Sequence, residues 1–147
     1  MLSHFLNKET ELKISNWEKE FNVKVIVTNP SKSRLGVFIS KRFSENNIRI
    51  NNNLNRYSFL ITLIHEMAHA SIWIKYGSKV TPHGLEWKME FKRMILPFLH
   101  PNYFPKDILS ALAKHMILPK ASTVRDVDLS TILRKYDVLP SFTIDRI

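Results

Sequence analysis

The chain of 147 residues contains no cysteine, which excludes disulfide bonds, thiolate metal ligands and a cysteine nucleophile. Glycine occurs only three times, and no segment reaches the run of about 18 apolar residues that a membrane-spanning helix needs. The N-terminal residues also lack the basic region and the apolar stretch of about 7 to 15 residues that mark a secretory signal peptide. We therefore expect a cytoplasmic protein that does not enter the membrane.

Length and charge limit the organisation further. We expect a single domain over residues 1–147, with 44% hydrophobic residues to form its core. The net charge of +9 would ordinarily indicate a polyanionic partner, although the excess is spread along the chain. A local group of cations lies among the predicted strands, with Phe38 and Phe43 between them: Lys32, Arg34, Lys41, Arg42 and Arg49. This group could neutralise phosphates and stack on bases, or it could be a solvated sheet face with the phenylalanines in the core.

The hydrophobic pattern predicts an α+β fold. The expected elements are a helix over residues 5–20, strands over 23–28, 35–40 and 47–51, a long helix over 57–76 that ends at Gly77, a helix opening near Pro82, and helices over 104–117 and 126–136. The segment 57–76 is apolar around almost its whole circumference, which indicates a buried central helix. We expect a short three-stranded antiparallel or mixed sheet packed on this helix, with residues 139–147 as a short strand or a disordered tail.

Two histidines and a glutamate stand within this apolar helix. His65 and His69 are four residues apart, so their imidazoles lie on one side of the helix and can bind one cation at about 2.0 to 2.1 Å. Glu66 then lies beside the metal, where a carboxylate can take a proton from a metal-bound water and pass it to a leaving amine. The H-E-x-x-H spacing is typical of zinc proteases. The alternative is a pair of hydrogen-bonded core histidines.

A third ligand must come from farther along the chain. The extended pattern with a histidine six residues after His69 is absent, because Lys75 stands there. The remaining candidates are His83, Glu86, Glu90, His100 and His115. We favour His83, fourteen residues after His69, because the first turn of a helix opening near Pro82 would direct it toward the central helix.

The other candidates have simpler interpretations. Glu86 and Glu90 could supply a carboxylate ligand. They are more readily interpreted as solvated charges paired with nearby cations, namely Lys88, Lys92 and Arg93. We interpret the remaining histidines as surface or partly buried side chains: His4, His100 and His115.

Several further motifs accompany the H-E-x-x-H helix. They are Trp17 and Phe21 before a strand, Leu35-Gly36, the run Ile48 to Asn51, the segment Leu63 to Ala70, and His83-Gly84-x-x-Trp87-Lys88. Over about residues 12 to 98 the chain thus resembles the SprT-like (SprT/Spartan) zinc metalloprotease family. The resemblance implies a zincin-like domain with Zn²⁺ held by His65, His69 and His83, a catalytic Glu66, and a connection with DNA-bound or crosslinked protein substrates. Many SprT-like proteins also carry a C-terminal zinc ribbon with paired cysteines, which this cysteine-free chain lacks.

These observations predict a zinc-dependent metallopeptidase with a protein or peptide substrate and DNA as a candidate second partner. If the sheet follows the zinc-protease arrangement, the strand at residues 47–51 would border the cleft and pair with an extended substrate. The alternative is a nucleic-acid-associated binding module whose metal site is structural or weakly catalytic. A structural site normally has four protein ligands, and only three good candidates are present, which favours the enzyme.

Overall fold

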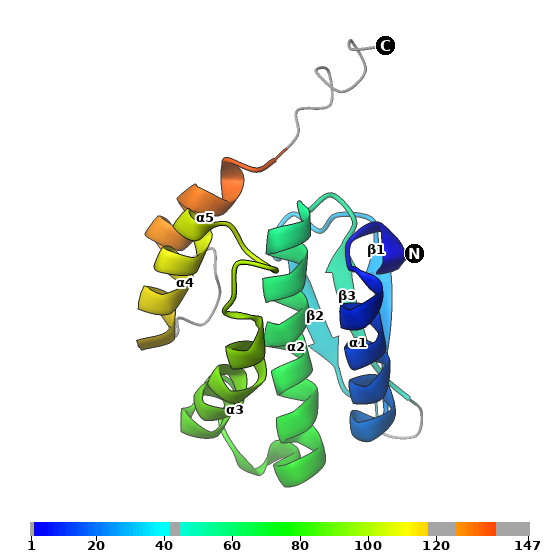
Figure 1. The fold of residues 1–147 in the computed structure, drawn as a ribbon. Coiled ribbons are helices and arrows are strands. Elements are labelled where there is room, and N and C mark those ends of the chain that lie inside the picture. Colours follow the sequence, from blue (N-terminus) through cyan, green and yellow to red (C-terminus); the bar gives the residue numbers. More distant parts are fainter. Residues whose placement is uncertain (1, 42–44, 118–125, 138–147) are drawn as a thin grey trace.

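The computed structural model describes residues 2–41, 45–117 and 126–137 (Figure 1). In this part of the chain, helices and strands follow the order expected of a small α+β protein. They are η1 (Leu2–His4), α1 (Lys8–Phe21), β1 (Val23–Thr28), β2 (Gly36–Ile39), β3 (Asn46–Asn51), α2 (Arg56–Tyr76), η2 (Gly77–Lys79), α3 (Leu85–Ile95), η3 (Leu96–Phe98), α4 (Lys106–Ile117) and α5 (Val127–Arg134). The short strand or disordered tail predicted for residues 139–147 lies outside the described residues.

The three strands form one mixed sheet in the order β1-β3-β2. Strand β1 runs parallel to β3, and β2 runs antiparallel to it, so that Val25 and Phe38 both lie opposite Ile48. The expectation that residues 47–51 border a cleft is therefore wrong, because β3 is the central strand. Its alternating Ile48 and Ile50 indicate one buried face, but they do not distinguish a central strand from an edge strand. The sheet edge beside α2 belongs to β2.

Helix α2 is the centre of the structure, and 14 of its 21 residues are buried. It lies with α1 on one face of the sheet, while α3, α4 and α5 gather on its other side (Figure 1). Asn55 begins the helix, since its Oδ1 accepts hydrogen bonds from the backbone N–H groups of Tyr57 and Ser58. Gly77 ends it with a φ of 61°, a left-handed conformation that favours glycine.

Other boundaries differ modestly from the sequence prediction. Helix α1 begins only at Lys8, because Asn7 accepts a hydrogen bond from the Thr10 N–H and so caps it. Phe5 lies before this helix and stacks on Phe59 of α2, with ring centroids 4.1 Å apart. Asp126 caps α5 by accepting a hydrogen bond from the Leu129 N–H, so this helix begins at Val127. Among the described residues, no helix combines the length and the apolar character needed to cross a membrane.

Candidate metal centre

Three histidines from two parts of the chain converge beside the sheet. His65 and His69 lie one turn apart on α2, and His83 lies on the loop that precedes α3. The expectation that His83 belongs to the first turn of a helix is wrong in this detail, since α3 begins at Leu85. His83 instead has a φ of 62°, and Gly84 next to it donates its N–H to the Thr81 carbonyl. A left-handed histidine is uncommon, and such backbone outliers concentrate at functional sites.

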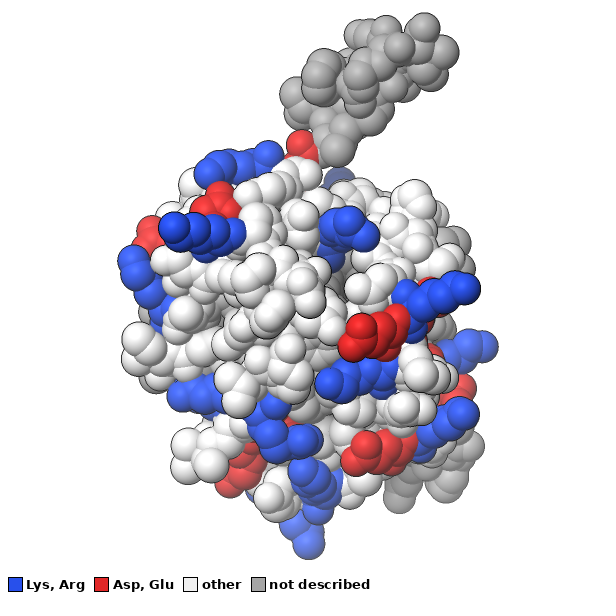
Figure 2. Space-filling view, in the orientation of Figure 1, with Lys and Arg blue, Asp and Glu red and all other residues white. Residues whose placement is uncertain are grey.

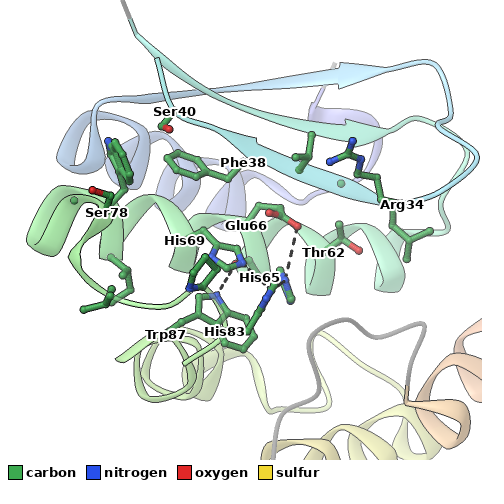
Figure 3. A pocket seen from close by; sticks show the side chains of 18 of the residues that line it. Arg34, Phe38, Ser40, Thr62, His65, Glu66, His69, Ser78, His83 and Trp87 are labelled. Atoms are coloured by element: carbon green, nitrogen blue, oxygen red, sulfur yellow. Dashed lines mark hydrogen bonds and ion pairs between the residues drawn. The ribbon is translucent and has the colours of Figure 1, made fainter. Parts of the chain in front are cut away.

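The ring nitrogens of these histidines face one another (Figure 3). His83 Nε2 lies 3.1 Å from His65 Nε2 and 2.9 Å from His69 Nε2. Two ligands of a tetrahedral ion at about 2.0 to 2.1 Å stand about 3.3 Å apart, which is close to both distances. Hydrogen bonds among the three rings account poorly for these close approaches of their nitrogens, because each neutral imidazole offers only one N–H donor. The three histidines therefore lie close enough to bind one metal ion, and their donor set suits zinc.

Burial keeps the imidazoles of His65 and His69 in the neutral form that binds metals. Burial lowers the pKa of His65 well below its usual value, and the neighbouring His69 and His83 lower it further. Burial likewise lowers the pKa of His69 to about 3, with a smaller effect from His83. The desolvation cost falls on the charged form of a base, so both rings are unprotonated at neutral pH. Each can offer a lone pair without first losing a proton.

Trp87 of α3 packs against all three histidines. Its ring centroid lies 4.6 Å from that of His65, 4.8 Å from that of His83, and 5.2 Å from that of His69, on which it stacks. Its side chain is completely buried, and its Nε1–H donates to the His65 carbonyl at 3.3 Å. The sequence motifs include Trp87 without indicating what its side chain contacts. The supporting role of its ring could not be inferred, because it depends on how α3 crosses α2.

Glu66 borders the histidines without belonging to their cluster. Its Oε2 lies 3.9 Å from His65 Nε2, and only 8% of the residue is exposed. Burial raises the pKa of this carboxyl to about 7, and a hydrogen bond from the Phe38 backbone N–H and the charge of Arg34 oppose the rise. The carboxyl can therefore take up or release a proton near neutral pH.

Glu66 and the three histidines line one cavity of about 750 Å³, which lies between α2, strand β2 and the segment 77–84. Its wall includes Ser33, Arg34, Leu35, Gly36, Val37, Phe38, Ser40, Thr62, Ile72, Trp73, Gly77, Ser78, Val80, Pro82 and Trp87. Figure 3 shows Arg34 and Thr62 on one side of Glu66, and Phe38, Ser40 and Ser78 on the other. The cavity therefore borders both strand β2 and the three histidines.

The other candidate ligands lie elsewhere. Glu90 is buried, with 6% exposure, so its interpretation as a solvated charge is wrong. Its carboxylate accepts hydrogen bonds from Arg93 at 2.7 Å and from Lys75 at 3.0 Å, and a further one from the Ser71 hydroxyl. Sequence spacing indicated Arg93 as a partner, but Ser71 and Lys75 lie on α2 and depend on the tertiary fold.

The remaining histidines are also separate from the cluster. His115 is buried, with 2% exposure, and its Nδ1 lies 2.8 Å from Asp126 Oδ2, so it joins α4 to the start of α5. His4 and His100 are exposed, as expected.

The fold and the histidine cluster together are compatible with a small zincin-like domain. A family model matches residues 3–103, and the chain belongs to the SprT-like family. This confirms the family resemblance of the sequence motifs, which extended over about residues 12 to 98. The comparisons with curated proteins and with solved structures gave no match.

Proposed function

We propose that the protein is a zinc-dependent metallopeptidase that hydrolyses peptide bonds of extended polypeptide segments. One observation carries this proposal: three imidazoles converge beside a buried glutamate in a cavity that opens onto a sheet edge. His65, His69 and His83 would hold the ion, which leaves a fourth coordination position without a protein ligand. Family membership supports zinc as the metal, because the SprT-like family is associated with zinc metallopeptidase-like domains.

The bound zinc would supply a Lewis acid that lowers the pKa of water to about 7. The protein must then move a proton. A Glu66 carboxylate oxygen accepts it from the water whose oxygen forms the new bond to the peptide carbonyl carbon. As the carbon–nitrogen bond breaks, Glu66 returns this proton to the leaving amine nitrogen, which restores the carboxylate. Burial raises the pKa of Glu66 to about 7 in the metal-free protein, and a bound cation would lower it and so favour the carboxylate that accepts the proton.

The substrate would bind by pairing with β2 rather than with β3. The Asn51 N–H donates to the Leu35 carbonyl, so Leu35 points its backbone groups toward β3. In an antiparallel pair the backbone N–H and C=O groups of successive residues point alternately toward and away from the neighbouring strand. Those of Gly36 and Phe38 therefore point away from β3, toward the free edge of the sheet. The hydrogen bond from the Phe38 N–H to Glu66 agrees with this orientation. Only an extended chain can pair with an edge strand, which favours unfolded segments as substrates.

The variant Glu66→Gln tests the proposal, because it preserves side-chain size and removes the proton acceptor. We expect it to retain zinc and to lose cleavage of a disordered protein by about 10²- to 10⁴-fold, the usual contribution of general acid and base catalysis. Zinc is measured by elemental analysis, and cleavage by mass spectrometry of the fragments.

Glu86→Gln is the matched control, because Glu86 lies outside the cavity wall, and it should cleave as the wild type does. Equal activity of Glu66→Gln and the wild type would overturn the assigned mechanism. A wild-type protein that binds zinc and cleaves no polypeptide, with or without DNA, would overturn the peptidase proposal itself.

A further inference from the structure

One end of the cavity has an apolar wall contributed by three separate elements. Phe38 comes from β2, Ile72 and Trp73 come from the last turns of α2, and Val80 follows η2. Gly77 makes this wall possible, because its left-handed backbone turns the chain away from α2 and brings the following residues back along the cavity. Ile72 and Trp73 follow Glu66 along α2, whereas Thr62 precedes it, so they belong to the end of the cavity where Figure 3 shows Phe38 and Ser78.

Trp73 differs from its neighbours in this wall. Phe38 and Val80 are partly buried and pack against the hydrophobic core, and Ile72 is itself a core residue with 8% exposure. Trp73 is also partly buried, but among the described residues it is not one of the apolar side chains that pack on this core. A large aromatic ring in a concave wall, with part of its surface in solvent, is the type of side chain that most often anchors a ligand.

The register of β2 determines which substrate side chains reach this wall. A Cβ atom added to Gly36 would meet the Thr62 side chain of α2, so Gly36 and the alternate residue Phe38 face α2. Residues directly opposite each other on neighbouring strands have side chains on the same face of the sheet. A substrate residue opposite Phe38 would therefore direct its side chain toward α2 and the apolar wall.

The charges around the cavity select for a neutral side chain. Among the described residues of the wall, Arg34 and Glu66 are the only ones of the Asp, Glu, Lys and Arg types. Arg34 lies beyond Glu66 from this end of the cavity (Figure 3). Ser40 and Ser78 are neutral, so a charged substrate group at the apolar end would lose water without gaining a countercharge.

We infer that Phe38, Ile72, Trp73 and Val80 form a side-chain subsite for a large apolar residue, aromatic or long aliphatic, next to the bond that is cleaved. This inference rests on the proposed peptidase function and adds to it a preference among unfolded segments. Cleavage sites in a disordered protein should cluster at such residues.

Peptides that differ at a single position, with Phe, Leu, Ala, Lys or Asp in an otherwise small and neutral sequence, test this preference. We expect kcat/KM for the Phe and Leu peptides to exceed that for the Ala peptide by about 10- to 200-fold, the range that apolar pockets provide. Trp73→Ala should remove most of this difference and retain zinc. Ile74→Ala is the matched control, because Ile74 is the next residue on α2, 51% exposed and outside the cavity wall.

Peptide binding by the zinc-loaded Glu66→Gln protein gives a readout that does not require turnover. The Phe peptide should bind more tightly than the Ala peptide, and this difference in affinity should be smaller in the double variant that carries both Glu66→Gln and Trp73→Leu. This result supports the subsite even if Trp73→Ala folds poorly. Equal binding and equal cleavage across the panel would overturn the subsite while leaving the peptidase proposal intact. Selective binding without cleavage by the wild type would overturn the peptidase proposal alone.

Discussion

His83 combines two requirements that seldom coincide, an imidazole side chain and a left-handed backbone. Among the described residues it shares positive φ, glycine apart, only with Asn22. Asparagine tolerates this conformation better than most residues do. The substitution His83→Asn therefore removes the imidazole while the backbone can keep its shape, which separates the loss of a ligand from a change in the loop.

We expect His83→Asn to weaken zinc binding by more than the roughly 10- to 100-fold that follows loss of a group merely supporting a ligand. The metal-free variant should unfold at the same temperature as the metal-free wild type. Titration against a competing chelator measures the first quantity, and thermal unfolding measures the second. Full zinc affinity in His83→Asn, together with its loss in Glu86→Ala, would transfer the third-ligand role to a carboxylate.

Glu90 joins the two helices that flank the histidine cluster, and its charge predicts a dependence of stability on pH. Burial alone would raise the pKa of this carboxyl, but the hydrogen bonds from Arg93, Ser71 and Lys75 outweigh it and lower the pKa to about 2. A lowered folded-state pKa stabilises the fold above the unfolded-state value of about 4.5, and this contribution is lost as the pH falls toward 2.

We expect the metal-free wild type to lose up to about 3 kcal/mol of unfolding free energy through Glu90 between pH 5 and pH 2. Glu90→Gln should be less stable at pH 6 and show a flatter profile over the same range. Urea unfolding at a series of pH values measures both, with Glu86→Gln as the control. Parallel profiles for the wild type and Glu90→Gln would contradict the assignment of this carboxylate as the charged bridge between α2 and α3.

At the scale of the elements, Gly36 allows β2 to approach α2 closely. A Cβ atom at this position would lie 2.7 Å from Thr62 Cγ2 and 2.9 Å from Ile50 Cδ1, closer than such atoms normally come. Because β2 also contributes Phe38 and the free edge beside Glu66, the position of this strand sets the width of the cavity.

Gly36→Ala should therefore cost about 1 to 3 kcal/mol of unfolding free energy, the usual penalty for overpacking, and should also lower peptide cleavage. Adding Thr62→Ser removes the Cγ2 atom in the way and should restore part of both losses. Unfolding and cleavage of the two single variants and the double variant form a double-mutant cycle. If the effects of the two substitutions on unfolding and on cleavage simply add, Gly36 and Thr62 are not in the close contact described here.

Local sequence patterns predicted the elements well and their arrangement less well. Strand β1 has the predicted bounds, and α2 begins one residue earlier than predicted. These elements could be predicted because apolar periodicity and a terminal glycine such as Gly77 are local features of the sequence. The place of β3 in the sheet was predicted wrongly, because it is the central strand and does not border the cavity. Two of its buried asparagines bind backbone groups outside the strand: Asn46 Oδ1 accepts from the Lys41 N–H, and Asn51 Nδ2 donates to the Arg34 carbonyl. No local pattern distinguishes these asparagines from loop residues.

The candidate site shows the same division. The spacing of His65 and His69 places both on one side of α2, which any helix of this sequence would do. His83 was selected from several candidates, and the structure brings it to the other two. The burial of Glu90 and the packing of Trp87 depend on how α3 crosses α2, and this crossing is a property of the tertiary fold.

At the scale of the whole molecule, the excess positive charge is dispersed. Figure 2 shows acidic and basic side chains interspersed over the face with α2 and α3. The predicted basic group is divided by the fold: Arg34 and Phe38 line the cavity, Arg49 is exposed on β3, and residues 42–44 lie outside the described residues. Phe38 is partly buried: it packs against the hydrophobic core and also lines the cavity.

We propose that DNA binds through exposed cations on and near the sheet, among them Lys41 and Arg49. Affinity should fall steeply with salt, and replacing both residues with Gln should flatten the slope of log K against log salt by up to about 1.8, or 0.9 for each phosphate that is no longer neutralised. Replacing Lys106 and Lys114 of α4 with Gln changes the net charge equally and should leave the slope unchanged. Absence of DNA binding at low salt would remove this proposal and leave the peptidase proposal standing.

The central position of α2 also determines how the site can be lost. The amide groups of His65 and Glu66 lie in the middle of the longest and most buried helix, so their hydrogens exchange with solvent only when most of the fold opens. Among the described residues we therefore expect the amides of the helix that carries His65, Glu66 and His69 to be among the slowest to exchange. His83 lies on the loop that precedes α3 instead, so we expect it to leave the cluster by local opening more readily than His65 or His69. Motion that dismantles this cluster is therefore expected to begin in that loop.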